Sequence, residues 1–465
     1  MSLKQGMHFE ISERKILLRI MDIVAVLGLL YLIGKTFHFD YFTVTKENWI
    51  WSLVLAVYIF VFGTVFEMYD LQASSKFDVT LKNIVITSSV TVLVYLFTPV
   101  LTPFLPEKRL QIIFFYVIII LALILWRLAY MTLFDLPRFY KRVLVIGDIS
   151  NIEHVKNTLS KSDPNYKIVG FIKSELEVDQ EGIKFKGLQE YESSDLFKVI
   201  SKEKISEILI AIYNPDSLTP ELYVNLINLL EGGFLIKEYA QVYEQIMHKV
   251  PLQYIGRDFY KYFPFSRSNQ NRFYLFISRT VDVFASILGL IIFIILLPLI
   301  LIGNLLGNRG PLFYRQDRVG KNGELFRITK LRTMIADAEK DGMKWAMKND
   351  ARVTAFGRIL RNLRIDEIPQ FINVVKGEMA LIGPRPERPF FVRELAAVIP
   401  FYETRHIIKP GLTGWAQVKM RYGSTVRDSM EKLQYDLYYI KRRSFFLDIN
   451  IIVKTISTVL YYRGQ

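Results

Sequence analysis

Two adjacent acids, Asp366 and Glu367, are the residues whose types and spacing most clearly suggest chemistry. They precede the apolar segment Ile368 to Val375, in which Pro369 favours the first turn of a helix. The start of a helix attracts phosphate, and neighbouring helical residues diverge by about 100°, so one carboxylate can face a phosphorus atom while the other holds a divalent cation. A helix cap beside a solvated acid is the simpler interpretation. A basic run directly before the acids favours the phosphate site, and it contains Arg358, Arg361 and Arg364.

A second feature is Arg385, which stands between Pro384 and Pro386. Prolines fix φ on both sides, so the guanidinium loses little entropy when it binds phosphate oxygens or a uracil carbonyl. A turn with a solvent-facing arginine would also explain a single Pro-Arg-Pro. Further positive charge lies upstream, at Arg315, Arg318, Lys330 and Arg332. Taken one at a time, these residues are more typical of an ordinary surface.

The composition limits the chemistry to carboxylates, histidines and hydroxyls. The chain has 465 residues, no cysteine and five histidines, so cysteine chemistry is excluded and a zinc site is not expected. Hydrophobic residues make up 51% of the chain, and the formal net charge is +14. Anionic lipid headgroups and phosphorylated substrates explain this combination better than nucleic acid does, so we expect no nucleic-acid partner.

The first third of the chain contains apolar stretches that are long enough to cross a bilayer, whose core takes about 20 helical residues. They are Ile16 to Gly34, Trp49 to Phe66, Ile84 to Leu105 and Leu110 to Met131. Basic residues flank both ends of this block, at Lys4, Arg14, Lys15 and Arg19 and again at Arg138, Lys141 and Arg142. Positive residues mark the cytoplasmic side. We therefore predict a four-helix transmembrane domain over residues 1–137 with both ends in the cytoplasm.

Residues 138–250 change to short β-branched runs separated by polar helical stretches, a pattern typical of an α/β domain with a parallel sheet. The runs are Val143 to Ile146, Ile168 to Ile172 and Ile208 to Ile212. The turn after the first run, Gly147 to Ser150, lacks the second and third glycines that let a backbone approach a pyrophosphate. We predict a Rossmann-like domain that binds no dinucleotide, followed by a linker over residues 251–271.

A fifth apolar stretch, Val283 to Ile302, contains Pro298, which bends or breaks a helix. One interpretation is a kinked transmembrane helix. The other is a hairpin over about residues 279–304 that enters the cytoplasmic leaflet, turns near Pro298 and returns. A crossing helix would place everything after it on the opposite side of the membrane from the α/β domain. The residues alone do not decide between the two.

The order and spacing of the motifs in residues 272–465 resemble the catalytic domain of the bacterial sugar transferases, the polyprenyl-phosphate hexose-1-phosphate transferases. The matching strings are Lys330 to Met334, Arg361 with Asp366 to Gln370, Asn373 to Met379, Gly383 to Pro386 and Pro410 to Val418. The leading spans and the α/β domain resemble the large, exopolysaccharide-initiating form of this family. The resemblance therefore extends over essentially the whole chain.

The resemblance implies transfer of a hexose-1-phosphate from a UDP-sugar to undecaprenyl phosphate, with release of UMP. It implies that Asp366 is the nucleophile, which forms a phospho-aspartyl intermediate, and that Glu367 is the principal ligand of Mg²⁺. The expected substrate contacts are Arg318, Lys330, Arg332, Arg361, Pro384, Arg385, Pro386 and Gln417. Members of the family also keep a membrane hairpin broken by a Ser-Pro pair. This chain has Leu297 and Pro298 there, so Pro298 is the expected break.

Together these patterns predict an α-helical transmembrane bundle, a Rossmann-like α/β domain, and an α-rich, membrane-associated catalytic domain with a re-entrant helix hairpin. An amphipathic stretch at Phe445 to Tyr462 is expected to lie on the membrane surface. The expected location is the bacterial inner membrane, with the active site on its cytoplasmic face, and a homodimer is an open alternative.

Two other functions fit less well. A membrane-anchored enzyme that modifies nucleotide sugars would need the glycines that the α/β domain lacks. A lipid-linked glycan transporter would place ionisable residues near the centres of the leading spans, where the sequence has almost none.

Overall fold

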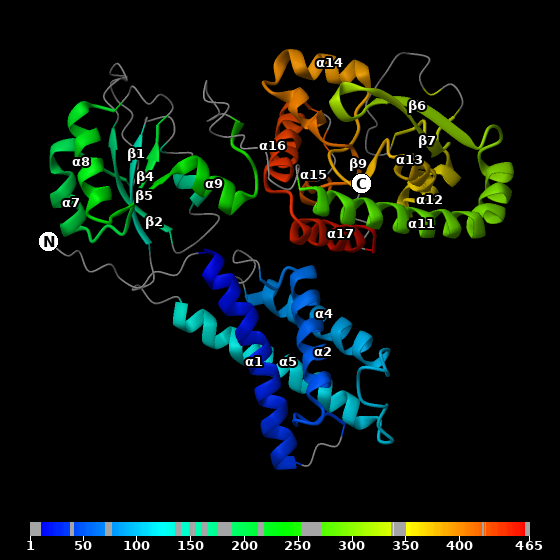
Figure 1. Cartoon of the computed structure of the whole chain (residues 1–465), viewed down its shortest axis with the longest axis horizontal. Coiled ribbons are helices and arrows are strands. Elements are labelled where there is room, and N and C mark those ends of the chain that lie inside the picture. The colour runs from blue at the N-terminus through cyan, green and yellow to red at the C-terminus, as the bar shows by residue number, and fades with distance from the viewer. Residues whose placement is uncertain are drawn as a thin grey trace. The chain divides into compact units, whose positions relative to one another are not determined.

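The computed structural model divides the chain into two units, Met1–Met247 and His248–Gln465, and each is described by itself. The described residues are 11–37, 41–69, 77–134, 141–147, 152, 155–159, 166–173, 188–212, 218–252, 271–335, 338, 350–420, 423 and 425–460. Figure 1 shows a helical part and an α/β part in the first unit, and an α-rich second unit.

Apolar helices form the first part of unit 1, as the sequence predicts. They are α1 (Ile11–Phe37), α2 (Trp49–Val65), α4 (Phe77–Leu96) and α5 (Leu110–Phe134). Their buried side chains pack together, among them Leu30, Ile59, Tyr95 and Phe115. α4 differs from the predicted stretch because it begins earlier and ends at Leu96, not at Leu105. Pro99 and Pro103 explain the early end, since proline and the residue before it disfavour a continuing helix.

Length and composition identify four helices among the described residues that could cross a membrane. They are Glu13–Phe37, Phe77–Leu96, Leu110–Leu133 and Arg272–Gly307. The shorter apolar helix α2 has 17 residues, or about 26 Å at 1.5 Å per residue. It is therefore slightly shorter than a hydrocarbon core of about 30 Å.

The helical part contains a buried ion pair that the sequence pattern does not predict. Arg127 of α5 donates to Asp22 of α1 at 2.7 Å, and both side chains are buried. This pair is an exception to the near absence of ionisable residues near the centres of the spans. Each charge has its partner within the bundle, which lowers the cost of burying it.

The second part of unit 1 is a parallel sheet with helices on both faces. Its strands are β1 (Lys141–Gly147), β2 (Tyr166–Lys173), β3 (Gln189–Tyr191), β4 (Glu207–Ala211) and β5 (Leu235–Glu238), in the order β3-β2-β1-β4-β5. All neighbouring strands are parallel, which confirms the predicted α/β architecture. Residues 148–150, on which the prediction about the pyrophosphate turn depends, lie outside the described residues.

The helices of the α/β part are short and amphipathic. Figure 1 shows α7 (Leu196–Lys202) and α8 (Pro220–Glu231) on one side of the sheet and α9 (Tyr239–Met247) on the other. A 3-10 helix, η2 (Ser193–Asp195), leads into α7. Leucines and isoleucines of α7 and α8 pack against β1 and β4, which gives this part its own core.

Unit 2 begins with one long helix and continues with short elements that build the candidate site. They are α11 (Arg272–Gly307), β6 (Phe313–Val319), η6 (Lys321–Gly323), β7 (Leu325–Leu331), α12 (Ala355–Asn362), η7 (Ile365–Gln370), α13 (Phe371–Lys376), β8 (Ala380–Ile382), α14 (Pro389–Val398), η8 (Tyr402–Ile407), β9 (Gly411–Thr413), α15 (Trp415–Lys419), α16 (Val426–Arg442) and α17 (Phe445–Leu460). β6 and β7 pair antiparallel, and β8 and β9 pair parallel. The unit is therefore α-rich, as predicted, with two small sheets in addition.

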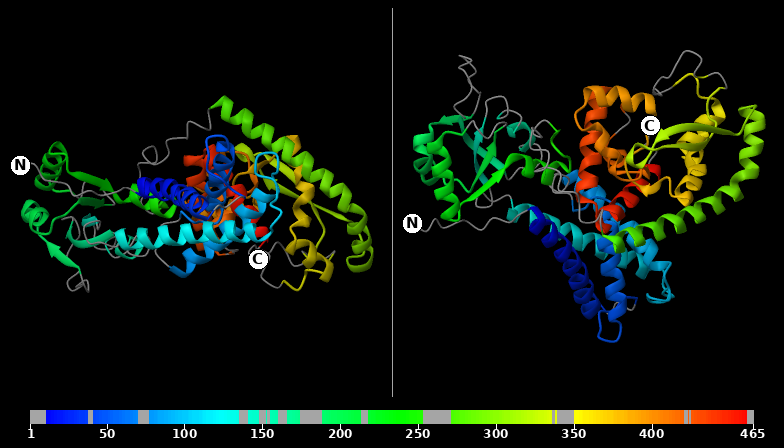
Figure 2. Two further views of the ribbon diagram at one scale, coloured as in Figure 1. Left: turned by 90° about the horizontal axis from the view of Figure 1, so that it is seen from below. Right: turned by 45° about the horizontal axis from the view of Figure 1, so that its top comes forward.

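α11 is one continuous helix of 36 residues with Pro298 inside it. The views in Figures 1 and 2 agree that it bends and follows the rest of unit 2. Gly289, before the proline, lies against the ring of Phe371, and Gly303, after it, lies against the ring of Phe356. Both arms of the helix therefore contact the unit. The structure contains one bent helix over the segment for which the sequence left open a kinked helix and a hairpin that turns near Pro298.

Residues 248–252 pack on unit 2 although they follow α9 directly. Val250 donates its N–H to Gln434 at 3.1 Å, and Trp415 donates its indole N–H to the carbonyl of His248 at 3.0 Å. Val250 and Leu252 are buried in the core of the unit. The boundary after Met247 therefore lies three residues before the predicted one at 250. Most of the predicted linker 251–271 lies outside the described residues.

Candidate active site

The two acids lie on the short 3-10 helix η7, between α12 and α13. Arg364, with a φ of 56°, adopts the left-handed conformation that ends α12 and leads into η7. Pro369 lies inside η7, next to its last residue, and not in a first helical turn as the sequence indicated. A 3-10 helix has about three residues per turn, so neighbouring side chains diverge by roughly 120°. Asp366 and Glu367 therefore have different surroundings, as the sequence suggests.

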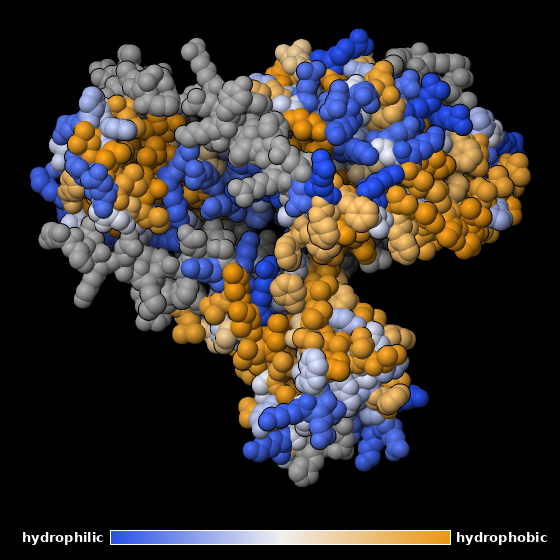
Figure 3. All heavy atoms as spheres, in the orientation of Figure 1, coloured by the Kyte–Doolittle hydropathy of each residue, from blue (hydrophilic) through white to orange (hydrophobic). Residues whose placement is uncertain are grey.

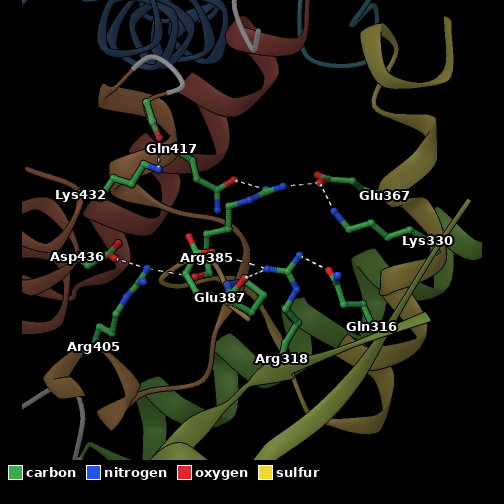
Figure 4. A network of polar contacts seen from close by, with 12 residues as sticks. Gln316, Arg318, Lys330, Glu367, Arg385, Glu387, Arg405, Gln417, Lys432 and Asp436 are labelled. Carbon is green, nitrogen blue, oxygen red and sulfur yellow. Dashed lines mark hydrogen bonds and ion pairs between the residues drawn. The ribbon is translucent and has the colours of Figure 1, made fainter. Parts of the chain in front are cut away.

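Glu367 lies among three cations that come from separate elements. Its Oε1 accepts from Lys330 of β7 at 2.9 Å and from Arg385 at 2.7 Å, and its Oε2 lies 4.0 Å from Arg364. Figure 4 shows Lys330 and Arg385 meeting at this carboxylate. Burial opposes ionisation, but the three positive charges hold the pKa of Glu367 well below its usual range. Glu367 is therefore ionised at neutral pH.

Asp366 is the more deeply buried acid, with 8% of its surface exposed. Burial, together with the neighbouring charge of Glu367, raises the pKa of Asp366 to about 6, against the opposing effect of nearby Lys330 and two arginines. Adjacent acids whose pKa values are pushed apart can take different roles. Asp366 is ionised above pH 6 and is the more basic of the two carboxylates, which suits a nucleophile.

Arg385 reaches Glu367 from the loop Gly383–Pro386. Its guanidinium also donates to Gln417 of α15 at 3.3 Å. The loop packs on β9, where Gly383 donates its N–H to Thr413 at 2.9 Å. Two of the predicted motifs, far apart in sequence, therefore meet at the carboxylate pair.

Arg318 of β6 supports the same loop. It donates to the carbonyl of Pro386 at 3.0 Å and to Gln316 at 2.6 Å, and it lies 3.7 Å from Glu387. Burial lowers the pKa of Arg318, but a guanidinium stays charged at neutral pH. Arg318 therefore supplies positive charge from a fixed position.

Arg332 holds the end of α11. Its buried guanidinium donates to the backbone carbonyls of Asn308 and Pro311, both at 2.8 Å. These bonds anchor the chain just after α11, and a contact of Arg332 with the substrate stays a prediction. Arg361, by contrast, donates to Thr333 Oγ1 at 2.9 Å and adds positive charge near the acids.

The sequence patterns miss three residues that Figure 4 shows on the left, on the side of Arg385 away from Glu367. Arg405 of η8 and Asp436 of α16 form an ion pair at 2.7 Å, and Lys432 of α16 donates to the carbonyl of Gly423 at 2.9 Å. The closeness of Arg405 to the motif that begins at Pro410 is a signal that could identify it. Asp436 and Lys432 lie in the amphipathic helix α16, whose sequence pattern does not distinguish them from its other charged residues.

Comparison with known proteins identifies the family of this chain. Residues 273–462 match the family model of the bacterial sugar transferases. The UDP-glucose:undecaprenyl-phosphate glucose-1-phosphate transferase of Caulobacter vibrioides is 40% identical over 184 residues, which cover 39% of this chain and 69% of that protein. The chain belongs to the bacterial sugar transferase family.

Two other relatives match over a smaller share of their own length. The UDP-N-acetylgalactosamine-undecaprenyl-phosphate N-acetylgalactosaminephosphotransferase of Aeromonas hydrophila is 45% identical over 187 residues, 40% of this chain and 44% of that protein. The UDP-glucose:undecaprenyl-phosphate glucose-1-phosphate transferase of Xanthomonas campestris pv. campestris is 42% identical over 180 residues, 37% of each chain. The chain therefore covers less than half of either relative. The family match begins with α11 and includes every residue of the candidate site.

The candidate site can be compared with the ligands that a magnesium ion requires. Among the residues that the structure describes, no group of three or more histidine, cysteine or acidic side chains could hold a metal ion. Mg²⁺, however, binds one or two protein carboxylates and completes its shell with waters and substrate phosphates. Glu367 is ionised and its Oε2 is 4.0 Å from Arg364. This oxygen therefore has the chemistry of a magnesium ligand.

Proposed function

We propose that this protein transfers a hexose-1-phosphate from a UDP-sugar to undecaprenyl phosphate and releases UMP. The observation that carries the proposal is the pair Asp366 and Glu367, whose pKa values shift in opposite directions within one cationic site. The names of the relatives support it, because they contain undecaprenyl phosphate together with glucose or N-acetylgalactosamine. Since these sugars differ, the hexose is left to experiment. We further propose that the product starts an exopolysaccharide, a capsule or another surface glycan.

The proposed reaction has two displacements at the phosphorus atom that carries the sugar. In the first, an Oδ of Asp366 bonds to this phosphorus, the bond from the phosphorus to the bridging oxygen of the diphosphate breaks, and UMP leaves with that oxygen. In the second, an oxygen of undecaprenyl phosphate attacks the same phosphorus and releases the Asp366 carboxylate. The products are UMP and a lipid diphosphate sugar, and Asp366 is regenerated.

The cations of the site neutralise the charge of the donor in this scheme. A carboxylate and a diphosphate repel each other, and phosphoryl transfer depends mainly on positioning and electrostatic stabilisation. Lys330 and Arg385 both contact Glu367. We propose that both residues also donate to the phosphate oxygens, while Gln417 accepts from the other edge of the Arg385 guanidinium.

We propose Mg²⁺ as the cofactor, with Glu367 as its principal protein ligand. When bound, the ion would supply charge stabilisation to the diphosphate. Lys330 and Arg385 contact Oε1 of Glu367 and fix the orientation of the carboxylate. Its Oε2 is then the oxygen that we propose for the ion.

We also propose that α11 enters and leaves the cytoplasmic face of the membrane and does not cross it. Polar groups bind the helix to its own unit on both sides of Pro298. Before the proline, Asp282 accepts from the N–H of Leu381 at 3.0 Å, and after it, Asn304 donates to the carbonyl of Gly310 at 3.0 Å. A helix that crossed the bilayer would carry Leu381, which follows it in the chain, to the opposite side and away from Asp282 of the first arm.

The opposite face of α11 is apolar and suits a lipid environment. In Figure 3 apolar residues gather along the edge of unit 2 that α11 forms. The most exposed apolar side chains of the helix are Phe273, Phe276, Phe284, Ile294, Ile295, Leu299, Leu305 and Leu306. A polar, anchored inner face and an apolar outer face are what a helix embedded in one leaflet requires.

Single cysteines test this topology, because the chain has no native cysteine. Suitable exposed positions are Lys198 in the α/β part, Glu324 in unit 2, and Glu107 between α4 and α5. In intact cells an impermeant thiol reagent should label position 107 and leave 198 and 324 unlabelled until the membrane is opened. Pro298→Leu, which lets the helix straighten, should expose position 324. Labelling of 324 but not 198 without that substitution would show that α11 crosses.

The reaction is tested with the purified full-length protein in detergent. UMP release is measured for a panel of UDP-sugars with Mg²⁺, in the presence and absence of undecaprenyl phosphate. We expect repeated turnover of at least one sugar when the lipid phosphate is present, and none from the Asp366→Asn protein. Folded protein that releases UMP from no UDP-sugar would contradict the proposal.

A further inference from the structure

We propose that Arg405 is a positioning residue that fixes the Arg385 guanidinium at the donor phosphates, an inference that rests on the proposed function. Arg405 follows Arg385 by 20 residues and lies outside the motifs that indicated the family. It contacts the backbone of Arg385, so it acts through that residue and not on the substrate.

The loop around Arg385 is held by its carbonyl groups, because its two prolines have no N–H to donate. The carbonyls of residues 384, 385 and 386 each accept a hydrogen bond from a different element. In that order the donors are the N–H of Gly411 at 2.9 Å, Arg405 at 3.1 Å and Arg318 at 3.0 Å. Arg405 supplies the central one of these three bonds.

Arg405 is itself fixed from two further directions. It donates to Asp436 of α16 at 2.7 Å, as Figure 4 shows. It also donates to the hydroxyl of Tyr402 at 2.7 Å. The side chains of Arg405 and Asp436 are only 4% and 2% exposed. Burying an ion pair costs desolvation free energy, and apolar residues often replace such a pair without loss of stability. A role in positioning Arg385 therefore explains this buried pair better than a contribution to stability does.

The position of Arg385 matters because Arg405 binds its backbone carbonyl while its guanidinium contacts Glu367 at 2.7 Å. Misplacing a catalytic group by about 1 Å can cost about 10²-fold in rate. Lysine at position 405 would keep the charge but lose the planar fork that reaches a carbonyl, a carboxylate and a hydroxyl together. Arg405→Lys should therefore lower kcat by roughly 10- to 100-fold.

A double-mutant cycle on the full-length protein separates positioning from general stability. Arg405→Lys is measured in the wild-type and in the Arg385→Ala background, with UMP release as the readout and thermal unfolding recorded in parallel. If Arg405 acts through the Arg385 guanidinium, its substitution should cost less than about twofold once that guanidinium is gone.

The matched control is Arg127→Lys, in the other deeply buried ion pair. Arg127 lies 2.7 Å from Asp22, and their side chains are 1% and 0% exposed. Arg127→Lys is therefore the same substitution as Arg405→Lys, made in a pair that is equally buried. Its effect on the rate should be the same factor in both backgrounds. If Arg405→Lys fails to fold, Tyr402→Phe removes a single hydrogen bond to Arg405. Tyr402→Phe should also lower the rate of UMP release only when Arg385 is present, by a smaller factor than Arg405→Lys does.

An equal cost of the substitution at 405 or 402 in both backgrounds would overturn the proposal and give Arg405 a purely structural role. Failure of the proposed function would give another result, because the wild-type protein would then release no UMP from any UDP-sugar. A wild-type protein that turns over, an inactive Asp366→Asn protein and an additive cycle would together reject this inference alone.

Discussion

The α/β part of unit 1 and the candidate site of unit 2, which we call the transferase unit, differ in where their charged side chains lie. In the α/β part, Arg142 pairs with Glu203 and Lys198 pairs with Asp195 at the surface, where water already stabilises both charges. Glu207, which is buried beside Lys237, is an exception. In the transferase unit the charged groups around Glu367 and Arg385 are largely withdrawn from water.

The difference indicates where charge is needed for chemistry. A surface pair contributes about 0 to 1 kcal/mol to stability, whereas a buried charge costs several kcal/mol to desolvate. A fold gains nothing from withdrawing Asp366, Glu367 and Lys330 together from water unless the cluster has a function. The same substitution should therefore have very different consequences in the two regions.

Asp366→Asn is expected to have the largest effect. An amide has nearly the shape of a carboxylate but is a poor nucleophile, so turnover should fall by at least about 10³-fold. The measurement is UMP release from the UDP-sugar in the presence of undecaprenyl phosphate. Retention of more than a few per cent of the activity would remove Asp366 from the role of nucleophile.

Folding of the Asp366→Asn protein provides the control. An acid whose pKa is higher in the folded than in the unfolded state weakens folding once the pH exceeds both values, and the pKa of Asp366 rises from 3.8 to about 6. At pH 7 the neutral amide should therefore be as stable as the aspartate or more stable, by on the order of 1 to 3 kcal/mol. Thermal unfolding at pH 7 checks this.

Glu367→Gln should have the next largest effect. The substitution removes the charge proposed to bind Mg²⁺ and leaves Lys330 and Arg385 without their carboxylate, so we expect a loss of about 10²-fold and a higher Mg²⁺ requirement. A Mg²⁺ titration of the rate measures both. Glu324→Gln, on the exposed turn between β6 and β7, should leave the titration unchanged. An unaltered Mg²⁺ requirement in the Glu367 variant would contradict its role as a ligand.

The dependence on pH is a smaller effect and tests Asp366 without mutation. Burial and the charge of Glu367 raise the pKa of Asp366 to about 6, and the nucleophile must be ionised. The rate of the first displacement should be nearly constant above pH 7 and fall about tenfold per pH unit well below pH 6. Rapid-mixing measurements of UMP formation between pH 5 and 8 give this profile. A constant rate down to pH 5 would show that the reacting group has an ordinary acid pKa.

Arg142→Gln is expected to have the smallest effect. It breaks the exposed pair with Glu203 in the α/β part, so stability should change by less than about 0.5 kcal/mol and UMP release by less than about twofold. A tenfold loss of activity would show that charge in the α/β part also serves the reaction, and would remove the contrast between the two regions.

The sequence predicts the features that depend on local pattern. The apolar stretches become α1, α2, α4 and α5, and the β-branched runs become a parallel sheet. The acid pair lies on one short helix, η7. The basic run before the pair and the apolar segment after it are the local pattern that indicates this helix. The proline at 298 predicts a bend, but whether the helix then breaks depends on the contacts of its two arms with the rest of the unit.

Features that depend on side-chain direction are not visible in the sequence. Arg332 and Lys330 stand two positions apart near the end of β7, yet Lys330 reaches Glu367 while Arg332 binds backbone carbonyls at the end of α11. Arg405 and Asp436 are 31 residues apart and meet because η8 and α16 pack together. A pattern gives the kind of residue, and tertiary packing decides what each residue contacts.

Trapping the covalent intermediate tests the central claim most directly. The full-length protein is mixed with a UDP-sugar that it uses and Mg²⁺, without undecaprenyl phosphate, and UMP and the mass of the protein are measured. We predict a burst of about one UMP per active site and a hexose phosphate adduct on the peptide that contains Asp366, which is absent from the Asp366→Asn protein. Addition of undecaprenyl phosphate should remove the adduct. If the protein turns over with the lipid phosphate but forms neither burst nor adduct without it, the sugar phosphate passes directly to the lipid and the account of Asp366 is wrong.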